Sequence, residues 1–378
     1  MRAHFSLLVL SFALGCGPGI ASTDSPPPGS DEPTPAPTPE PTPDPVDDLL
    51  VDLHVDTITA MVENGWTWDD ERLEASLPEL VAAGVDVVVQ AIWIPRGAED
   101  PRGLALDRIH RIRRMVQRSR GRAALVTGPD QLEAAVRQGR VAVVVALEGG
   151  TALESGTETL DELAGLGLSM VGLTWTESSP YADSSAEPRS GSAAGLTDAG
   201  RAMVAACNAR GLMIDVSHMS DRATEDTLAV STAPVLASHS NAREIAPTPR
   251  NLPPHLLEGI VAGGGLVGVM FHGPFVVKGK AASTADVVAQ VRHLVETYGA
   301  DHVGLGSDWD GKIKSPEGLT GSKDLPALLR ELEAAGLSAS SVSAVSGGAF
   351  LRFWRSVRAV GAAARSEGRT DPPTLPDE

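Results

Sequence analysis

Short β-branched apolar runs alternate with amphipathic segments along this chain, and that alternation constrains its fold more than any other feature. One intervening segment, Thr197–Arg210, places Met203, Val204 and Cys207 on a single helical face. Repeats of strand and helix favour an α/β fold of the (β/α)₈ TIM-barrel type, with a doubly wound open sheet as the alternative because periodicity does not show closure. The runs predicted to be strands are Leu49–Ile58, Val85–Ile94, Val141–Glu148, Met170–Trp175, Leu212–His218, Pro234–Ser240, Leu266–His272 and His302–Trp309.

Charge and composition exclude several classes of protein. The 378 residues include 31 Lys+Arg and 49 Asp+Glu, a net charge of −18, which argues against a nucleic-acid partner because phosphate binding needs a basic surface. Two cysteines cannot build a disulfide scaffold. No uninterrupted apolar run approaches the ~20 residues that a membrane-spanning helix needs. No glycine-rich phosphate loop follows the first run, which argues against a nucleotide-binding fold.

The first residues have the pattern of an export signal. Arg2 precedes an apolar stretch, Phe5–Leu14, and small residues follow it. The segment around Cys16 resembles a bacterial lipoprotein signal, in which the cysteine becomes the lipidated first residue of the mature protein. Ordinary cleavage near Gly19-Ile20-Ala21 is the alternative, with a periplasmic or secreted product. We therefore predict an exported protein of the bacterial cell envelope, whose only membrane contact is a lipid anchor.

The remaining composition predicts a simple domain order. Residues 1–15 form the signal peptide, and residues 16–46 form a linker in which PTPAPTPEPTPDP favours extended polyproline II. Residues 47–363 form the barrel, and residues 364–378 form a disordered tail.

Ionisable side chains gather where the apolar runs end. Because the carboxyl ends of barrel strands meet at one mouth, such residues are expected to lie together. A buried carboxylate or imidazole is costly unless it is paired or bound to metal. Single members can be core histidines or helix caps, which is the bland alternative for each. Together, imidazole nitrogens and carboxylate oxygens suit zinc or a similar divalent ion, and their number favours two ions, since one catalytic zinc takes three protein ligands. The six residues are His54, Asp56, Glu148, His218, His239 and Asp308.

Several motifs around these residues resemble the membrane dipeptidase (renal dipeptidase) family of binuclear zinc peptidases, within the amidohydrolase superfamily. They occur in the family's order between Asp52 and Gly311, and the Arg250-Asn251 pair belongs to the set. The other matching segments are DLHVDT, ALEGG, LTW, DVSHMS, ASHSNAR and GLGSDWDG.

The resemblance implies a binuclear zinc site and its ligands. One ion would be held by His54, Asp56 and Glu148, and a second by Glu148, His218 and His239. A hydroxide bridging the two ions would attack the peptide bond of a dipeptide, possibly one with a C-terminal D-residue. The implied enzyme is a metallo-dipeptidase, and members of the family are often homodimers.

The resemblance also implies residues that handle protons and substrate. Asp308, with Glu148 as the bridging ligand, would be catalytic, and Arg250 would bind the substrate's terminal carboxylate. Trp175 stands where the family has a histidine that contacts the substrate carbonyl. His272 stands where relatives have a tyrosine, and we expect it to replace part of the missing electrophile; a packing role is its alternative.

Two other functions remain compatible with the residues. An amidase or lactamase acting on N-acyl amino acids is favoured by the loss of the fourth-strand histidine at Trp175. A non-catalytic surface lipoprotein on the same scaffold is disfavoured by the complete set of metal ligands.

Overall fold

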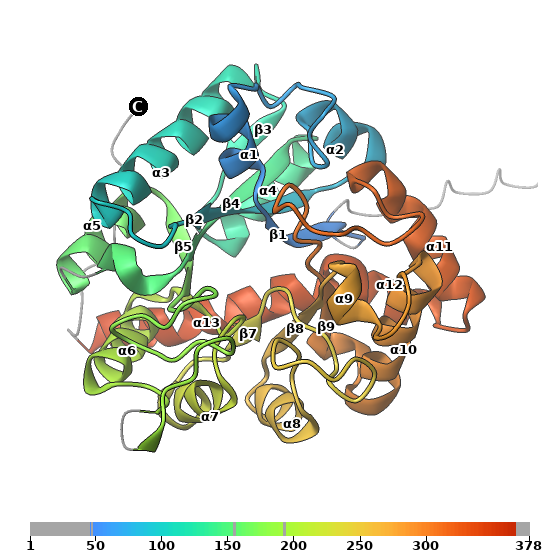
Figure 1. Cartoon of the computed structure of the whole chain (residues 1–378). Helices are drawn as coiled ribbons and strands as arrows, with labels where there is room; N and C mark the ends of the chain where they lie inside the picture. The colour runs from blue at the N-terminus through green and yellow to red at the C-terminus, as the bar shows by residue number, and fades with distance from the viewer. Residues whose placement is uncertain (1–45, 47, 154–155, 192–193, 368–378) are drawn as a thin grey trace, which may run out of the picture. The chain divides into compact units, whose positions relative to one another are not determined.

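A parallel β-sheet organises the part of the chain that the computed structural model describes, which is residues 46, 48–153, 156–191 and 194–367 (Figure 1). Within these residues the sheet has nine strands, and eight of them run in the order β1-β2-β4-β5-β6-β7-β8-β9, while β3 pairs only with β4. The strands are β1 Val51–Val55, β2 Val87–Trp93, β3 Ala123–Leu125, β4 Val141–Glu148, β5 Leu168–Gly172, β6 Met213–Asp215, β7 Leu236–Ala237, β8 Leu266–Val269 and β9 Val303–Leu305.

The two ends of this eight-strand path approach one another. A parallel bridge joins Val55 to Trp309 just beyond β9, Asp56 N donates to Trp309 O (2.8 Å), and Asp308 N donates to His54 O (2.9 Å). The sheet is therefore a nearly closed parallel barrel, which confirms the predicted fold class and rejects the open sheet. Each predicted run overlaps one barrel strand, although β5 begins two residues before its run, and the additional strand β3 is only three residues long.

Most strands are shorter than their apolar runs predict, and only β4 has the predicted bounds, Val141–Glu148. Helix α1 begins at Thr57, inside the run predicted to continue to Ile58. Strand β6 ends at Asp215, three residues before His218, and β9 ends at Leu305, three residues before Asp308. Most of the predicted ligands consequently lie in the turns that leave the strands, where side chains can converge without having to follow the pleat.

Helices surround the barrel and connect its strands (Figure 1). Local signals set their ends: Thr197 Oγ1 accepts from Gly200 N at the start of α6, and Gly211 ends that helix in the left-handed conformation at φ 68°. The helices are α1 Thr57–Asn64, α2 Leu77–Ala83, α3 Pro101–Arg118, α4 Pro129–Arg137, α5 Thr157–Leu166, α6 Asp198–Arg210, α7 Asp221–Val230, α8 Pro254–Ala262, α9 Gly273–Val276, α10 Thr284–Tyr298, α11 Leu325–Ala334, α12 Ala339–Ser343 and α13 Ala349–Ser366.

The last helix, α13, corrects one predicted boundary. It packs Phe350 and Trp354 into the same apolar cluster as alternate residues of the strands, including Val87 and Val89. The helix continues past the predicted domain end at residue 363 because Ala364 is still buried against the domain. The start of the predicted tail is therefore helical.

Other predicted segments lie outside the described residues. These are the signal peptide, Cys16, the linker up to residue 45, and residues 368–378. In the described part of the chain, no helix combines the length and the apolar character needed to cross a membrane.

Candidate metal centre

Five barrel strands deliver the six predicted site residues to one place. His54 lies on β1 and Glu148 ends β4, so backbone pairing positions both directly. The remaining four follow strands in turns: Asp56 after β1, His218 after β6, His239 after β7 and Asp308 after β9.

A single oxygen atom, Glu148 Oε1, lies at the centre of the group. It is 3.1 Å from His218 Nε2, 3.6 Å from His239 Nε2 and 3.7 Å from His54 Nε2. Two ligand atoms bound about 2.1 Å from one tetrahedral ion lie about 3.4 Å apart, so these spacings are those of shared coordination. Glu148 thus faces imidazoles from both sides of the barrel, as a bridging carboxylate must.

The remaining distances divide the group into overlapping sets. His54 Nε2 lies 3.9 Å from Asp56 Oδ2 and 3.9 Å from Asp308 Oδ1, and His218 Nε2 lies 3.1 Å from His239 Nε2. The sets able to hold an ion are His54, Asp56 and Glu148; Glu148, His218 and His239; and His54, His239 and Asp308.

Two buried atoms test whether these residues fit a metal ion. His54 Nε2 and Asp56 Oδ1 are both shielded from solvent and have no hydrogen-bond partner. Asp56 occupies the N-cap position of α1 but its side chain caps nothing, which rejects the helix-cap alternative. Buried polar groups normally have partners, so these two atoms fit ligands of a cation.

Electrostatics point the same way. Burial and the neighbouring carboxylates raise the pKa of Asp56 to about 7, and they raise the pKa values of Glu148 and Asp308 well above their ordinary range. Burial lowers the pKa of His54 to about 3. It also lowers the pKa of His218 and His239 well below the ordinary value. The imidazoles are therefore neutral, as metal ligands are, and the buried carboxylates beside them are groups whose negative charge a divalent ion would balance.

A hydrogen-bond relay sets the orientation of two imidazoles. The Ser238 hydroxyl donates to Asp215 Oδ2 (2.5 Å), and its oxygen lies 2.7 Å from His239 Nδ1 and 3.3 Å from His54 Nδ1. A hydroxyl has one hydrogen and two lone pairs, and the carboxylate takes the hydrogen. Both imidazoles must then donate from Nδ1, which leaves each Nε2 with a lone pair for a metal.

A second buried carboxylate, that of Asp52, joins β1 to the turn after β9. Asp52 accepts from Ser307 N (2.9 Å) and Ser307 Oγ (2.5 Å), and its Oδ1 accepts from His54 N (3.2 Å). Burial raises the pKa of Asp52 to about 6.

One predicted ligand, His218, and the predicted catalytic residue Asp308 occupy unusual backbone conformations. His218 and Asp308 have φ values of 67° and 68°, in the left-handed region that favours glycine. Side chains in that region are uncommon, and they cluster at functional sites where surrounding contacts hold them. In both cases the turn redirects the chain directly after a strand, which aims the side chain into the mouth.

A cavity of about 270 Å³ opens over the metal residues. Trp175 and His272 both line it, and so does Trp93, whose ring packs edge-on to that of Trp175 at 4.9 Å. His272 Nδ1 accepts from Lys314 N (3.1 Å), which places the proton of the neutral ring on Nε2. Burial lowers the pKa of His272, which favours this neutral form.

Arg250 lies in the wall beside the ligands rather than along the cavity. It is buried, with Nη1 donating to Ser240 Oγ (2.8 Å) and Nη2 donating to His239 O (2.9 Å), while Nε has no partner. A guanidinium has five N–H donors, so two are engaged in holding the turn after β7 and three remain.

Sequence reasoning missed the supporting residues Asp215, Ser238, Asp52 and Ser307. The signal was present, because Asp215 and Asp52 are acids inside apolar runs, the same pattern that singled out His54. The serines carry no such signal, since a buried hydroxyl satisfied by its neighbours is common.

Comparisons with known proteins agree with this geometry. Dipeptidase 3 of Rattus norvegicus is 32% identical over 294 residues, covering 76% of this chain and 59% of that protein. Dipeptidase aclJ of Aspergillus oryzae is 36% identical over 218 residues, covering 57% of this chain and 51% of that protein. The matched regions thus span little more than half of these relatives.

Solved structures extend the likeness to the whole barrel. A metallopeptidase from Rhodobacter sphaeroides, bound to a phosphinate mimic of the dipeptide L-Ala-D-Ala, superposes with a TM-score of 0.77 at 25% identity, covering 82% of this chain and 99% of that one. The metallopeptidase dipeptidase AC gives 0.76 at 26% identity, covering 82% and 98%.

The family model described as membrane dipeptidase (peptidase family M19) matches residues 46–368, which include every strand and every predicted metal ligand described above. This match confirms the resemblance drawn from the motifs: the chain belongs to the membrane dipeptidase family.

Proposed function

We propose that this protein is a zinc-dependent dipeptidase. The observation that carries the proposal is the position of Glu148 Oε1 within 3.7 Å of three imidazole nitrogens, below a cavity of about 270 Å³. That volume is at or below the small end of ligand sites, about 300–1,000 Å³, which suits a very short peptide. The Rhodobacter sphaeroides relative, which holds a dipeptide mimic with a D-residue, supports dipeptides with a C-terminal D-residue as substrates.

The residues would hold two ions in the sets that the distances define. His54, Asp56 and Glu148 would hold one, and Glu148, His218 and His239 the other. Imidazole and carboxylate ligands in such numbers favour zinc. When bound, two divalent ions supply Lewis acidity and make a water molecule acidic enough to react at neutral pH.

Asp308 is the residue proposed to move protons. Its carboxylate is slightly exposed to the cavity, and burial together with Asp56 raises its pKa. A carboxyl group with a raised pKa can accept a proton from the attacking water and return it to the leaving amine. The left-handed backbone at Asp308 fixes the side chain at the mouth for this exchange.

Arg250 and His272 are proposed to orient the substrate. Arg250 does not line the cavity of about 270 Å³, so a terminal carboxylate would have to reach its three unused N–H groups beside His239, which would restrict substrates to those with a free C-terminus. His272, with its proton on Nε2, can donate to the substrate carbonyl, whereas Trp175 can donate from its indole nitrogen but carries no positive charge.

Metal content and a substrate panel test the function. The full-length protein should contain about two zinc ions per chain and hydrolyse L-L and L-D dipeptides. Zinc with turnover of N-acyl amino acids alone would show instead the amidase or lactamase suggested by Trp175. Absence of both metal and turnover would leave the non-catalytic scaffold.

Two variants separate the proposed roles at the cavity. Asp308→Asn should abolish dipeptide turnover while zinc content is retained. His272→Ala should lower kcat by about tenfold, since it removes one donor to the carbonyl. Unchanged turnover in His272→Ala would show that His272 only packs against Phe275, whose ring lies 4.8 Å away.

The cellular location is proposed from the N-terminal pattern alone. We propose that the protein is exported and anchored through a lipid on Cys16, so radiolabelled palmitate should enter the wild-type protein and not the Cys16→Ser variant. Labelling of neither would point to ordinary signal cleavage and a periplasmic or secreted enzyme. The homodimer stays a prediction, and light scattering tests it.

A further inference from the structure

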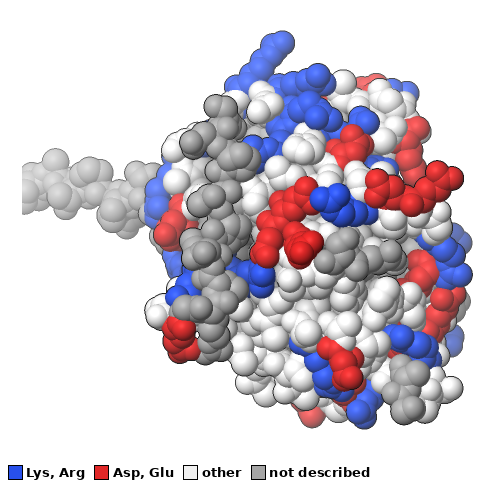
Figure 2. All heavy atoms as spheres, turned by 90° about the vertical axis from the view of Figure 1, so that its left-hand side faces the viewer, with Lys and Arg blue, Asp and Glu red and all other residues white. Residues whose placement is uncertain are grey.

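Arginine is concentrated in one short region of this acidic protein. Eight arginines lie between Arg102 and Arg122, with Asp107 as the single acid among them, in a chain whose net charge is −18. Most of these residues belong to α3. Figure 2 shows Lys and Arg gathered on the upper part of the face on which α3 lies at the left of Figure 1.

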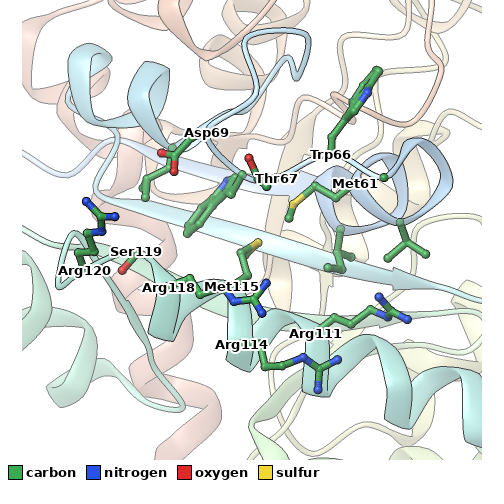
Figure 3. A pocket seen from close by; sticks show the side chains of 15 residues that line it. Met61, Trp66, Thr67, Asp69, Arg111, Arg114, Met115, Arg118, Ser119 and Arg120 are labelled. Atoms are coloured by element: carbon green, nitrogen blue, oxygen red, sulfur yellow. The ribbon is translucent and has the colours of Figure 1, made fainter.

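Part of this region borders a groove of about 730 Å³, which we call the arginine groove. Its walls are α1, residues 65–69 that follow it, and the C-terminal half of α3 (Figure 3). The groove is distinct from the cavity over the metal residues, because the two share no lining residue.

The floor of the groove is apolar and adaptable. Met61 and Met115 lie on its two sides, and Ile58 and Trp68 complete the buried surface (Figure 3). Methionine side chains are flexible and accommodate irregular apolar ligands. Trp66 adds a large aromatic surface beside them.

The rim carries positive charge that the acids of the described residues do not fully neutralise. Arg111 pairs with Asp107, and the one acid that lines the groove, Asp69, pairs with Arg122. Across the described residues, no acidic side chain pairs with Arg114, Arg118 or Arg120, and all three are exposed. Arg111, Arg114 and Arg118 follow helical spacing, so one face of α3 presents them together along the groove (Figure 3).

We propose that the arginine groove binds a single-chain amphiphile with a phosphate head group. The unpaired guanidinium groups suit a phosphate, which accepts from more than one planar fork, and the apolar floor suits the chain attached to it. The volume lies within the range of small-molecule sites, about 300–1,000 Å³.

Helix α1 gives this site a route to the metal centre. Ile58 and Met61 face the arginine groove. Thr59 lines the cavity of about 270 Å³ over the candidate metal ligands, and Asp56 directly precedes the helix. A ligand in the groove therefore contacts the opposite side of the element that positions a metal residue.

Calorimetric titration of the full-length protein with dodecyl phosphate, below its micelle concentration, tests the proposal. Dodecyl phosphate should bind more tightly than dodecanoate, and dodecyltrimethylammonium and inorganic phosphate should bind far more weakly. The double variant Arg114→Glu/Arg118→Glu should weaken binding by about tenfold or more, because two charge-assisted contacts are lost. Both residues are exposed, and thermal unfolding checks that the variant folds.

Arg330→Glu on α11 is the matched control, since Arg330 is also exposed and lies outside the groove. It should change the affinity by less than about twofold. A second variant, Met61→Glu, tests the apolar floor and should also weaken binding. The proposal is overturned if dodecyl phosphate does not bind, if the cationic amphiphile binds as tightly, or if the double variant keeps wild-type affinity. Equal or tighter binding of dodecanoate would overturn the choice of phosphate.

Discussion

The first half of the barrel, strands β1 to β4, and the second half, strands β5 to β9, are held together in different ways. In the first half, β2 and β4 pair continuously from Val87 with Ala142 to Trp93 with Glu148. In the second half, β6 and β7 pair through a single residue pair, Asp215 with Leu236. Strands β7 and β8 pair through only two.

Side chains take over where the second half lacks backbone pairing. The Asp215 carboxylate accepts from Ser217 N, Ser238 N and Ser238 Oγ, which joins the ends of β6 and β7. Asn241 Oδ1 accepts from Met270 N and its Nδ2 donates to Met270 O, so one amide reproduces a strand pairing between the ends of β7 and β8.

In the first half, the interactions that stabilise the sheet are therefore distinct from those that orient the site residues. In the second half, the same side chains do both. In the first half a change of apolar side chain leaves the backbone pairing intact. In the second half the polar groups that close the barrel also orient His239, so a change there should affect both the fold and the metal.

The largest expected effect comes from Glu148, where the two halves meet. Glu148→Gln replaces the bridging carboxylate by an amide that cannot bridge two ions, so kcat/KM for a dipeptide should fall by about 10³-fold or more and bound zinc should drop. Kinetics and elemental analysis measure both. Glu99→Gln, at an exposed position, is the control. Full zinc content and full activity in Glu148→Gln would show that Glu148 does not bridge two ions.

Asp215 tests the relay in the second half. In Asp215→Asn the new amide donates to Ser238 Oγ, whose hydrogen then turns toward His239 Nδ1 and forces the proton of that ring onto Nε2. We expect zinc affinity to fall about 10–100-fold, measured by competition with a chelator. Asp86→Asn is the matched control, because Asp86 also accepts a backbone N–H, from Leu50 (2.8 Å), but lies in the first half.

Substitutions of Asn241 and Val144 test one residue in each half, and both should lower the free energy of unfolding by similar amounts. Asn241→Ala removes buried hydrogen bonds and should lower the free energy of unfolding by about 2–4 kcal/mol, with a loss of zinc affinity because the turn after β7 loosens. Val144→Ala should lower it by about 2–3 kcal/mol and leave zinc affinity unchanged. Denaturant unfolding and zinc titration measure the two quantities, and equal effects on zinc would contradict the distinction.

Asp86 gives the smallest effect and concerns stability alone. Burial raises its pKa to about 6, from an ordinary 3.8, so its ionisation opposes folding as the pH rises through that interval. Asp86→Asn should therefore raise Tm relative to wild type at pH 7.5, and this gain should shrink as the pH falls through 6 toward 4. A gain in Tm that grows on acidification would show that ionised Asp86 stabilises the fold instead of destabilising it.

Sequence predicted the barrel, and it singled out six residues that the fold brings together, because both depend on local patterns. Each predicted run overlaps a barrel strand, and the family match confirms the resemblance. The left-handed turns at His218 and Asp308 were not predictable. They occur where β6 and β9 end early, and there side chains from distant parts of the sequence take the place of the backbone hydrogen bonds of the sheet. Asn241 was missed for the same reason, whereas Asp215 could have been found as an acid inside an apolar run.

The seam between β1 and the turn after β9 has a consequence for the order of assembly. Asp52 and Ser307, which close it, are separated by 255 positions, and His54 and Asp308 meet at the same place. The first strand must therefore wait for the last before the barrel can close and before Asp308, the proposed proton carrier, reaches the other site residues. A chain that stops short of β9 contains all five predicted metal ligands but lacks Asp308 and the Ser307 contacts that close the barrel, so the proposed catalytic site is assembled only after the last strand has docked.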